Sequence, residues 1–213
     1  MVAPRGGFMS RDRSRLQSVA VQPEVVLASS SANRRDLLGR LIDGFRVCEP
    51  VGGEPLVEGE TGRERALRLS RHKAGSVRTA YPSHLIIGSD QVAECGGRVL
   101  HKPGTPERAR ADLEWASGRS IHFWTGLALL DTRNGLEYTA VDHTRVWMRT
   151  LSAGEIARYL EADQPWSCAA SFRAESRGPS LWHRLATRDP TALVGLPLIR
   201  LAHFLRQAGY PVP

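Results

Sequence analysis

The sequence has few cysteines, no close-set histidines and no long apolar run, and each absence excludes a class of protein. Its three cysteines, Cys48, Cys95 and Cys168, are widely spaced and form no CxxC pair, so we expect free thiols rather than a disulfide framework or a zinc knuckle. The seven histidines show no HExxH spacing, which leaves carboxylates as the expected ligands of any metal ion. No apolar run is long enough to cross a bilayer, and residues 1–17 contain no signal-peptide core. We therefore expect a cytoplasmic protein without a membrane partner.

Length and composition are those of a globular chain with a basic excess. The chain has 213 residues, of which 41% are hydrophobic and 24% are charged. Lys and Arg outnumber Asp and Glu by 29 to 22, and this net charge of +7 favours an anionic partner. Part of the excess lies in residues 1–22, which we expect to be a disordered basic tail, with residues 23–213 folding as a single domain. Without alternating basic and aromatic residues, we expect no nucleic acid partner.

The hydrophobic pattern predicts a mixed α/β fold with hairpins rather than strict alternation of strands and helices. Asn134-Gly135 is the strongest hairpin signal, and Ser152 and Glu155 have the spacing of a capping box. The predicted strands are 24–28, 45–48, 85–88, 92–95, 99–100, 120–130 and 136–149, with a possible short strand at 168–172. The predicted helices begin near residues 33, 63, 106, 152 and 197, and the second of them is expected to follow an irregular loop at 50–62 and to run to residue 80. Residues 163–190 are expected to be irregular apart from the possible strand and one turn of helix near residue 181.

The segment LIIGSDQV, Leu85 to Val92, is the first candidate for chemistry. Its apolar residues predict a buried strand that ends at Gly88, and Asp90 follows where the sequence turns polar. Ligands of α/β proteins bind beyond such strand ends, so Asp90 is a candidate site residue. An aspartate just past a strand is also typical of a turn or a helix cap, and the strand position alone does not decide between the two.

The segment ASSSANRR is the second candidate. A strand that ends in small hydroxyl residues such as Ser29 and opens into a helix presents free backbone N–H groups, which hold phosphate well. Arg34 and Arg35 add positive charge to that place. The alternative is a serine cap followed by two solvated arginines, and the segment contains no P-loop motif.

Four charged residues in predicted loops and helices form a third candidate group: Glu54, Lys73, Asp90 and Lys102. Two carboxylates can hold Mg²⁺ while the ion bridges phosphate oxygens, and a carboxylate can also deprotonate a water. Lysines can neutralise a polyphosphate leaving group. Taken singly, each residue is as well explained as a surface charge.

Several of these segments, in this order, resemble the Maf family of nucleoside triphosphate pyrophosphatases. The resemblance covers about residues 25–207, and it rests on the runs LASSSANRRDLL, LIIGSDQV, HKPGTPERARADLEWASGR, FWTGLALL and LVGLPL. It implies a central mixed sheet flanked by helices, with a cleft between two lobes. It also implies hydrolysis of a nucleoside triphosphate to the monophosphate and pyrophosphate with Mg²⁺ or Mn²⁺, commonly by a homodimer, and a role in restraining septum formation.

The resemblance also assigns roles to residues of this chain. The general base falls on Asp90, which also serves as a metal ligand together with Glu54. The positions that bind the substrate phosphates fall on Ser29, Arg34, Arg35, Lys73 and Lys102.

Base selectivity is expected to resemble that of the 7-methyl-GTP subgroup. That subgroup has Gln after the catalytic Asp and Glu in an FxxEGxG stretch, which correspond to Gln91 and Glu175. A carboxylate suits the adjacent N–H donors of guanine and the positive charge of 7-methylguanine.

The chain departs from the pattern at three positions: Asn33 replaces a Trp, Gly53 replaces an Asp, and Ser176 replaces a Gly. Two alternatives therefore stay open: a pyrophosphatase of pyrimidine nucleotides, and a weakly active nucleotide-binding regulator of cell division.

Overall fold

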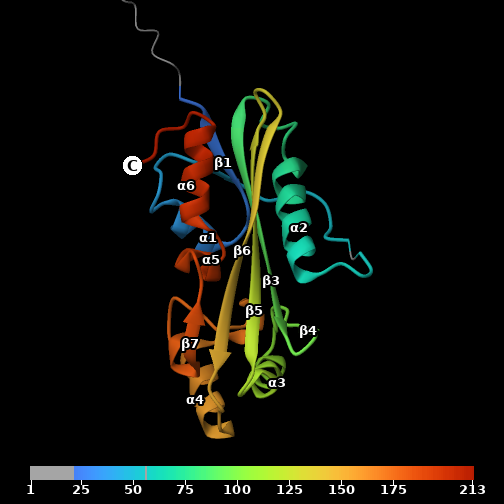
Figure 1. Cartoon of the computed structure of the whole chain (residues 1–213), viewed down its shortest axis with the longest axis vertical. Coiled ribbons are helices and arrows are strands. Elements are labelled where there is room, and N and C mark those ends of the chain that lie inside the picture. Colours follow the sequence, from blue (N-terminus) through green and yellow to red (C-terminus); the bar gives the residue numbers. More distant parts are fainter. Residues whose placement is uncertain (1–21, 56) are drawn as a thin grey trace, which may run out of the picture.

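One mixed seven-stranded sheet runs through the whole fold and confirms the predicted α/β class. The computed structural model describes residues 22–55 and 57–213, so the predictions for residues 1–21 lie outside it (Figure 1). The sheet order is β2-β1-β3-β5-β6-β7, with the short strand β4 paired to β3. In the described residues, no helix is long and apolar enough to cross a membrane.

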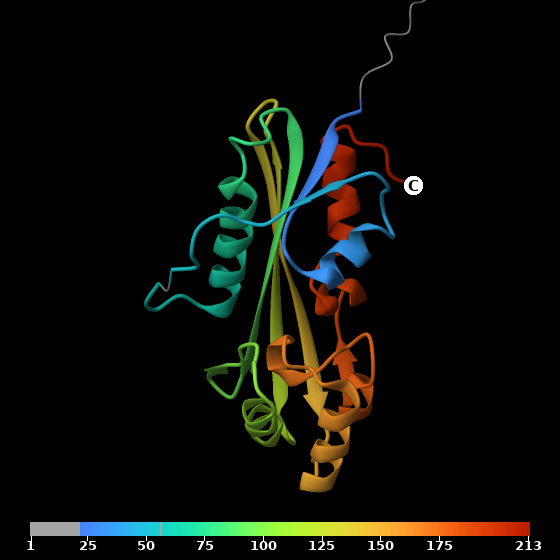
Figure 2. The same cartoon turned by 180° about the vertical axis from the view of Figure 1, so that it is seen from behind.

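Three long antiparallel strands extend through both halves of the molecule (Figures 1 and 2). They are β3 (His84–Cys95), β5 (Ser120–Asp131) and β6 (Leu136–Met148). The parallel strands β1 (Glu24–Ala28) and β2 (Arg46–Cys48) extend the sheet at one end of β3, and β4 (Arg98–Val99) forms a hairpin at the other. The far edge is β7 (Trp182–Ala186), which pairs with the end of β6.

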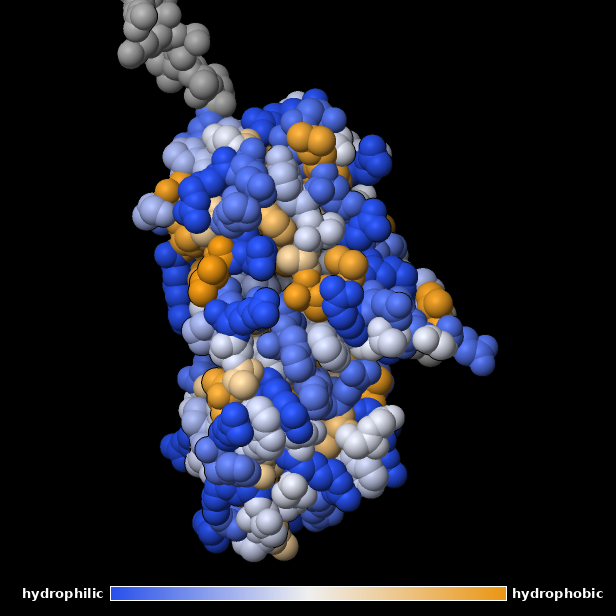
Figure 3. All heavy atoms as spheres, in the orientation of Figure 1, coloured by the Kyte–Doolittle hydropathy of each residue, from blue (hydrophilic) through white to orange (hydrophobic). Residues whose placement is uncertain are grey.

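Helices cover the two faces of the sheet unequally. In the upper half, α2 (Gly62–Ser76) lies on one face and α1 (Ala32–Leu38), α5 (Pro190–Val194) and α6 (Leu198–Gln207) lie on the other (Figure 1). The lower half holds α3 (Pro106–Ala116), α4 (Ala153–Asp163) and the short 3-10 helices η1 (Ala169–Ser171) and η2 (Gly178–Leu181). The space-filling view shows a mostly hydrophilic face with apolar side chains in separate groups (Figure 3).

Local sequence signals set where most helices begin. Ser152 and Glu155 form the predicted capping box, and Thr105 caps α3 in front of Pro106, as expected. A second capping box, between Thr61 and Glu64, begins α2 inside a stretch that the sequence pattern assigns to a loop. These caps satisfy N–H groups that the first helical turn leaves unpaired.

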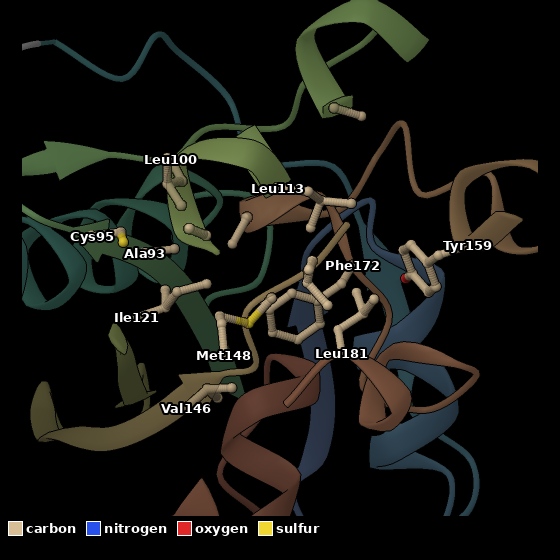
Figure 4. Close-up of a cluster of buried hydrophobic side chains, with 14 of the residues drawn as sticks. Ala93, Cys95, Leu100, Leu113, Ile121, Val146, Met148, Tyr159, Phe172 and Leu181 are labelled. Carbon is tan, nitrogen blue, oxygen red and sulfur yellow. The ribbon is translucent and has the colours of Figure 1, made fainter. Parts of the chain in front are cut away.

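The buried side chains of the lower half form one cluster between the sheet, α3, α4 and η1. Phe172 lies in this cluster beside Met148 and Leu181, and its ring meets that of Phe123 edge to face at 5.6 Å (Figure 4). The chain that follows Phe172 carries Glu175, so the core fixes the start of the segment that presents this carboxylate.

Four expectations about secondary structure are wrong. The strand expected to end at Gly88 continues to Cys95, because the polar residues after it stay paired with β5. The possible strand at 168–172 is the 3-10 helix η1, in which Ala170 and Ser171 have positive φ. The helix expected to extend to residue 80 ends at Ser76. The region thought irregular after residue 181 contains β7 and α5.

Helix α2 lies directly on the backbone of the sheet at two glycines. A Cβ atom on Gly88 would lie 2.2 Å from the carbonyl oxygen of Ser70, and one on Gly126 would lie 2.0 Å from that of Ala66. Any side chain at either position would therefore push the helix off the sheet.

We expect Gly126→Ala to lower the free energy of unfolding by about 1–3 kcal/mol, because the new methyl group forces α2 away from β5. Gly75→Ala, in the same helix but with open space around it, is the control and should lose no stability. Urea denaturation of both variants measures the difference. An unchanged midpoint for Gly126→Ala would show that the helix does not depend on this contact.

Candidate active site

A cavity of about 880 Å³ opens where β1 ends beside β3. The pairing of β1 with β3 stops at Ala28 and Gly88, while β3 continues for another seven residues. Residues 90–93 therefore line the cavity along an edge of β3. A crevice where one strand stops and its neighbour continues is a usual ligand site in α/β proteins. Asp90 thus lies at the crevice as expected, although in the middle of a strand rather than after its end.

Alternation along β3 gives the two sides of the cavity different chemistry. Asp90 points towards α2, where its carboxylate meets Lys73. Ser89 and Gln91 point the other way, towards the backbone carbonyls of Gly195 and of Ala192 and Leu193. Because successive strand residues face opposite sides, one short stretch supplies both halves of the site.

On the α2 side, one lysine joins two carboxylates. Lys73 Nζ lies 2.5 Å from Asp90 Oδ1 and 2.7 Å from Glu54 Oε1. The side chains of Lys73 and Asp90 are only 14% and 11% exposed, whereas that of Glu54 is 46% exposed. The buried pair thus holds the more exposed carboxylate of Glu54 at the cavity.

Positive charge dominates around Glu54. Burial by itself raises the pKa of Glu54, but the hydrogen bond and charge of Lys73, with the charges of Arg65 and Lys102, outweigh it and lower the pKa. Burial lowers the pKa of Arg34, which the charges of Asp90 and Glu54 oppose. The pocket therefore keeps Glu54 ionised and presents cations to an anionic ligand.

The same two carboxylates suit a hard divalent cation. Mg²⁺ or Mn²⁺ in nucleotide sites usually has one or two carboxylates with phosphate oxygens and water. The Lys73 ammonium already binds one oxygen of each carboxylate, so a metal ion would use the carboxylate oxygens that Lys73 leaves free. Within residues 22–55 and 57–213, no group of three or more His, Cys, Asp or Glu side chains converges on a metal position. A metal ion here would therefore depend on the substrate for its remaining ligands.

The loop between β1 and α1 holds Arg34 against the cavity. Arg34 Nε donates to the carbonyl of Gly195 at 2.9 Å, and Nη1 lies 3.4 Å from Ser29 Oγ. Ser31 caps α1 by accepting from the backbone N–H of Arg34. Ser29 is buried and does not line the cavity, so its part here is to support Arg34.

Arg35, like Ser29, is a predicted phosphate-binding residue that does not line the cavity. Its side chain is 58% exposed and lies 3.5 Å from Asp36. Successive helix positions are turned by about 100°, so Arg34 and Arg35 point in different directions. Lys102 does line the cavity, as predicted.

The three expected selectivity residues all line the same cavity. Asn33 Nδ2 donates to Glu175 Oε1 at 2.8 Å, although the two residues are 142 positions apart. Ser176 donates through its hydroxyl to Asp163 Oδ1 at 2.6 Å and so ties the Glu175 segment to α4. Two of the departures from the family pattern, Asn33 and Ser176, thus orient or anchor the Glu175 carboxylate.

Arg65 is a cavity residue that sequence reasoning missed. It lines the cavity from α2 with Leu69 and Lys73, and these three residues are four positions apart, a spacing that places them on one helix face. Within the described chain, its Nε atom is buried without a hydrogen-bond partner. A buried donor of this kind favours an anionic ligand that the protein itself does not supply.

We expect Glu54→Gln to be less stable than the parent protein at pH 7, with the difference narrowing at low pH. Because the folded-state pKa of Glu54 lies below its ordinary value of 4.5, its contribution is present above that value and is lost as pH falls through the folded pKa. Melting temperatures at pH 7 and pH 3.5 measure the effect, with Glu58→Gln as the control from the same loop. If the melting temperatures of Glu54→Gln and the parent protein differed by the same amount at both pH values, the interaction of ionised Glu54 with Lys73 would be contradicted.

Comparison with known proteins agrees with the geometry. A family model described as "Maf-like protein" matches residues 24–208. A protein of Xanthomonas campestris is 46% identical over 193 residues, covering 91% of this chain and 100% of its own, and one of Pseudomonas fluorescens is 48% identical over 190 residues, covering 89% and 98%. A Pseudomonas aeruginosa protein is 46% identical over 191 residues, covering 90% and 100%. All three are named 7-methyl-GTP pyrophosphatase. The chain belongs to the Maf family.

Proposed function

We propose that this protein is a nucleoside triphosphate pyrophosphatase that hydrolyses 7-methyl-GTP to 7-methyl-GMP and pyrophosphate. The observation that carries the proposal is the placement of the Asp90–Lys73–Glu54 cluster in one cavity with Gln91 and Glu175. The Asp90–Lys73–Glu54 cluster suits a triphosphate and its attacking water, and Gln91 with Glu175 suits the hydrogen-bonding edge of guanine. The names of the three relatives support the same substrate.

Asp90 is the group that would accept a proton from the attacking water. Lys73 contacts its Oδ1, which leaves Oδ2 for the water. The water oxygen bonds to the α-phosphorus as the α–β phosphoanhydride bond breaks. A proton of the water passes to Asp90, and pyrophosphate leaves. Lys73 holds the carboxylate in one orientation during this step.

Five Lys and Arg residues line the cavity, and four of them, Arg34, Arg65, Lys73 and Lys102, would face the triphosphate and its leaving group. Charge accumulates on the pyrophosphate oxygens as the bond breaks, so fixed cations there stabilise the transition state more than the substrate. Glu54 and Asp90 would hold a Mg²⁺ or Mn²⁺ ion, which supplies further neutralisation of phosphate charge when bound.

Glu175 and Gln91 are the groups that would read the base. Guanine presents N1–H and its 2-amino group side by side, and these two donors suit a carboxylate and an amide oxygen as acceptors. Methylation at N7 adds a positive charge, which Glu175 also favours. Asn33 cannot stack on the base as a Trp would, but its hydrogen bond keeps Glu175 in place.

A weakly active nucleotide-binding regulator stays the second candidate, and Gly53 favours it. In the family pattern an Asp precedes Glu54, so this chain has one carboxylate fewer for a metal ion. The compact contact of Lys73 with both remaining carboxylates favours hydrolysis instead. The expected homodimer, cytoplasmic location and role in septum formation stay predictions.

Asp90→Asn should lower kcat for pyrophosphate release by about 100- to 10,000-fold, because the amide keeps the shape of the side chain but cannot take the proton. Asp43→Asn, at an exposed position outside the cavity, serves as the control and should keep parental activity. Circular dichroism checks that both variants fold. Normal turnover by purified Asp90→Asn would remove Asp90 from the mechanism.

Arg65→Gln should raise KM for the triphosphate by about tenfold or more, since a charge-assisted hydrogen bond to phosphate is lost. Arg63→Gln is the matched control, because Arg63 is an exposed residue of the same helix that does not line the cavity. Steady-state kinetics with 7-methyl-GTP compare the two. Equal KM values for both variants would place Arg65 outside the binding site.

A further inference from the structure

The side-chain amide of Gln91 is held by three oxygen atoms behind the cavity wall. Its Nε2 lies within hydrogen-bond distance of Thr125 Oγ1 at 3.0 Å, of the carbonyl of Ala192 at 2.9 Å and of that of Leu193 at 3.1 Å, so its two hydrogens are shared among three acceptors. Backbone carbonyls only accept hydrogen bonds, so the nitrogen, and not the oxygen, must occupy this position. The orientation of the amide therefore follows from its surroundings, and Oε1 is the end left for a ligand.

Thr125 is the part of this arrangement that depends on a side chain. It is completely buried and lies opposite Gln91 in the pairing of β3 with β5. Its hydroxyl accepts from Gln91 and donates to the carbonyl of Ala192 at 3.0 Å, so it joins the amide to α5.

Helix α5 is itself held firmly. The buried Asp189 caps it by accepting from the backbone N–H and the hydroxyl of Thr191, at 2.9 Å and 2.6 Å. Asp189 also accepts from the backbone N–H of Ile199 at 2.7 Å, which joins α5 to α6. The carbonyl groups that face Gln91 thus belong to an element held by several hydrogen bonds, and a ligand cannot turn the amide without breaking its partly buried hydrogen bonds.

We propose that Thr125 is a positioning residue for base selectivity, which holds Gln91 so that it only accepts hydrogen bonds from the base. This inference rests on the proposed function of the cavity. Gln91 Oε1 and the Glu175 carboxylate are then two acceptors, and together they require a base edge with two adjacent donors. Guanine and 7-methylguanine have such an edge. Hypoxanthine lacks the 2-amino group, and uracil has a single N–H between two carbonyls.

The test compares the binding of 7-methyl-GMP and 7-methyl-IMP, which differ only in the 2-amino donor. We expect the parent protein to bind 7-methyl-GMP at least about tenfold more tightly, because an analogue that lacks the donor leaves a buried acceptor unpaired. In Thr125→Val this ratio should fall by about three- to tenfold, and in Gln91→Met it should fall further. Thr125→Ser keeps the hydroxyl and should restore the parental ratio. Isothermal titration calorimetry measures the affinities.

The control is Thr139→Val, an exposed β6 position, which should leave the ratio unchanged. A ratio in Thr125→Val equal to that of the parent, or no preference in the parent protein itself, would overturn the inference.

Binding of the monophosphates is independent of turnover, so the two proposals can fail separately. A protein that prefers 7-methyl-GMP but releases no pyrophosphate from 7-methyl-GTP would keep the role of Thr125 and reject the proposed hydrolysis. Hydrolysis of 7-methyl-GTP without preference for the 2-amino group would reject the role of Thr125 alone.

Discussion

The site depends first on the direct contact of α2 with the backbone of the sheet at Gly88 and Gly126. With no side chain between them, the helix lies close enough for Lys73 to reach Asp90 in the middle of β3. The face of α2 that carries Arg65 and Lys73 is then turned towards the cavity, while its small residues lie on the strands. A helix lifted by a methyl group or more would separate the lysine from its carboxylates and lose the cluster.

The second constraint is the early end of β1. Because β3 continues past its parallel partner, the cavity reaches both faces of the sheet around one strand edge. In the proposed function, Asp90 serves the phosphate side and Gln91, the next residue, serves the base side. Different elements position the two residues. Asp90 is held by α2 and the loop that carries Glu54, whereas Gln91 is held by α5 and lies on the side of the segment that carries Glu175. Changes in base preference can therefore arise without disturbing the reacting groups.

Sequence reasoning predicted the parts that depend on local signals. The hairpin at Asn134-Gly135 and the caps at Thr105 and Ser152 appear where expected, since each is fixed by a few neighbouring residues. Most predicted site residues line one cavity, as the cleft implied by the family resemblance led us to expect. The sequence pattern did not predict that β3 continues through Asp90, because polar residues that follow an apolar run are also typical of the end of a strand. The Asn33–Glu175 bond and the Thr125–Gln91 arrangement join residues far apart in the chain, so they become visible only in the folded molecule.

The most direct test of the account is pyrophosphate release with Mn²⁺ over 7-methyl-GTP, GTP, dTTP, UTP and CTP. The account predicts the highest kcat/KM for 7-methyl-GTP, followed by GTP, with one pyrophosphate formed for each monophosphate. Pyrimidine nucleotides should be poor substrates, since they lack two adjacent donors for Gln91 and Glu175. Faster turnover of UTP or dTTP than of 7-methyl-GTP would contradict the assignment of the base side, and release of orthophosphate in place of pyrophosphate would contradict the reaction itself.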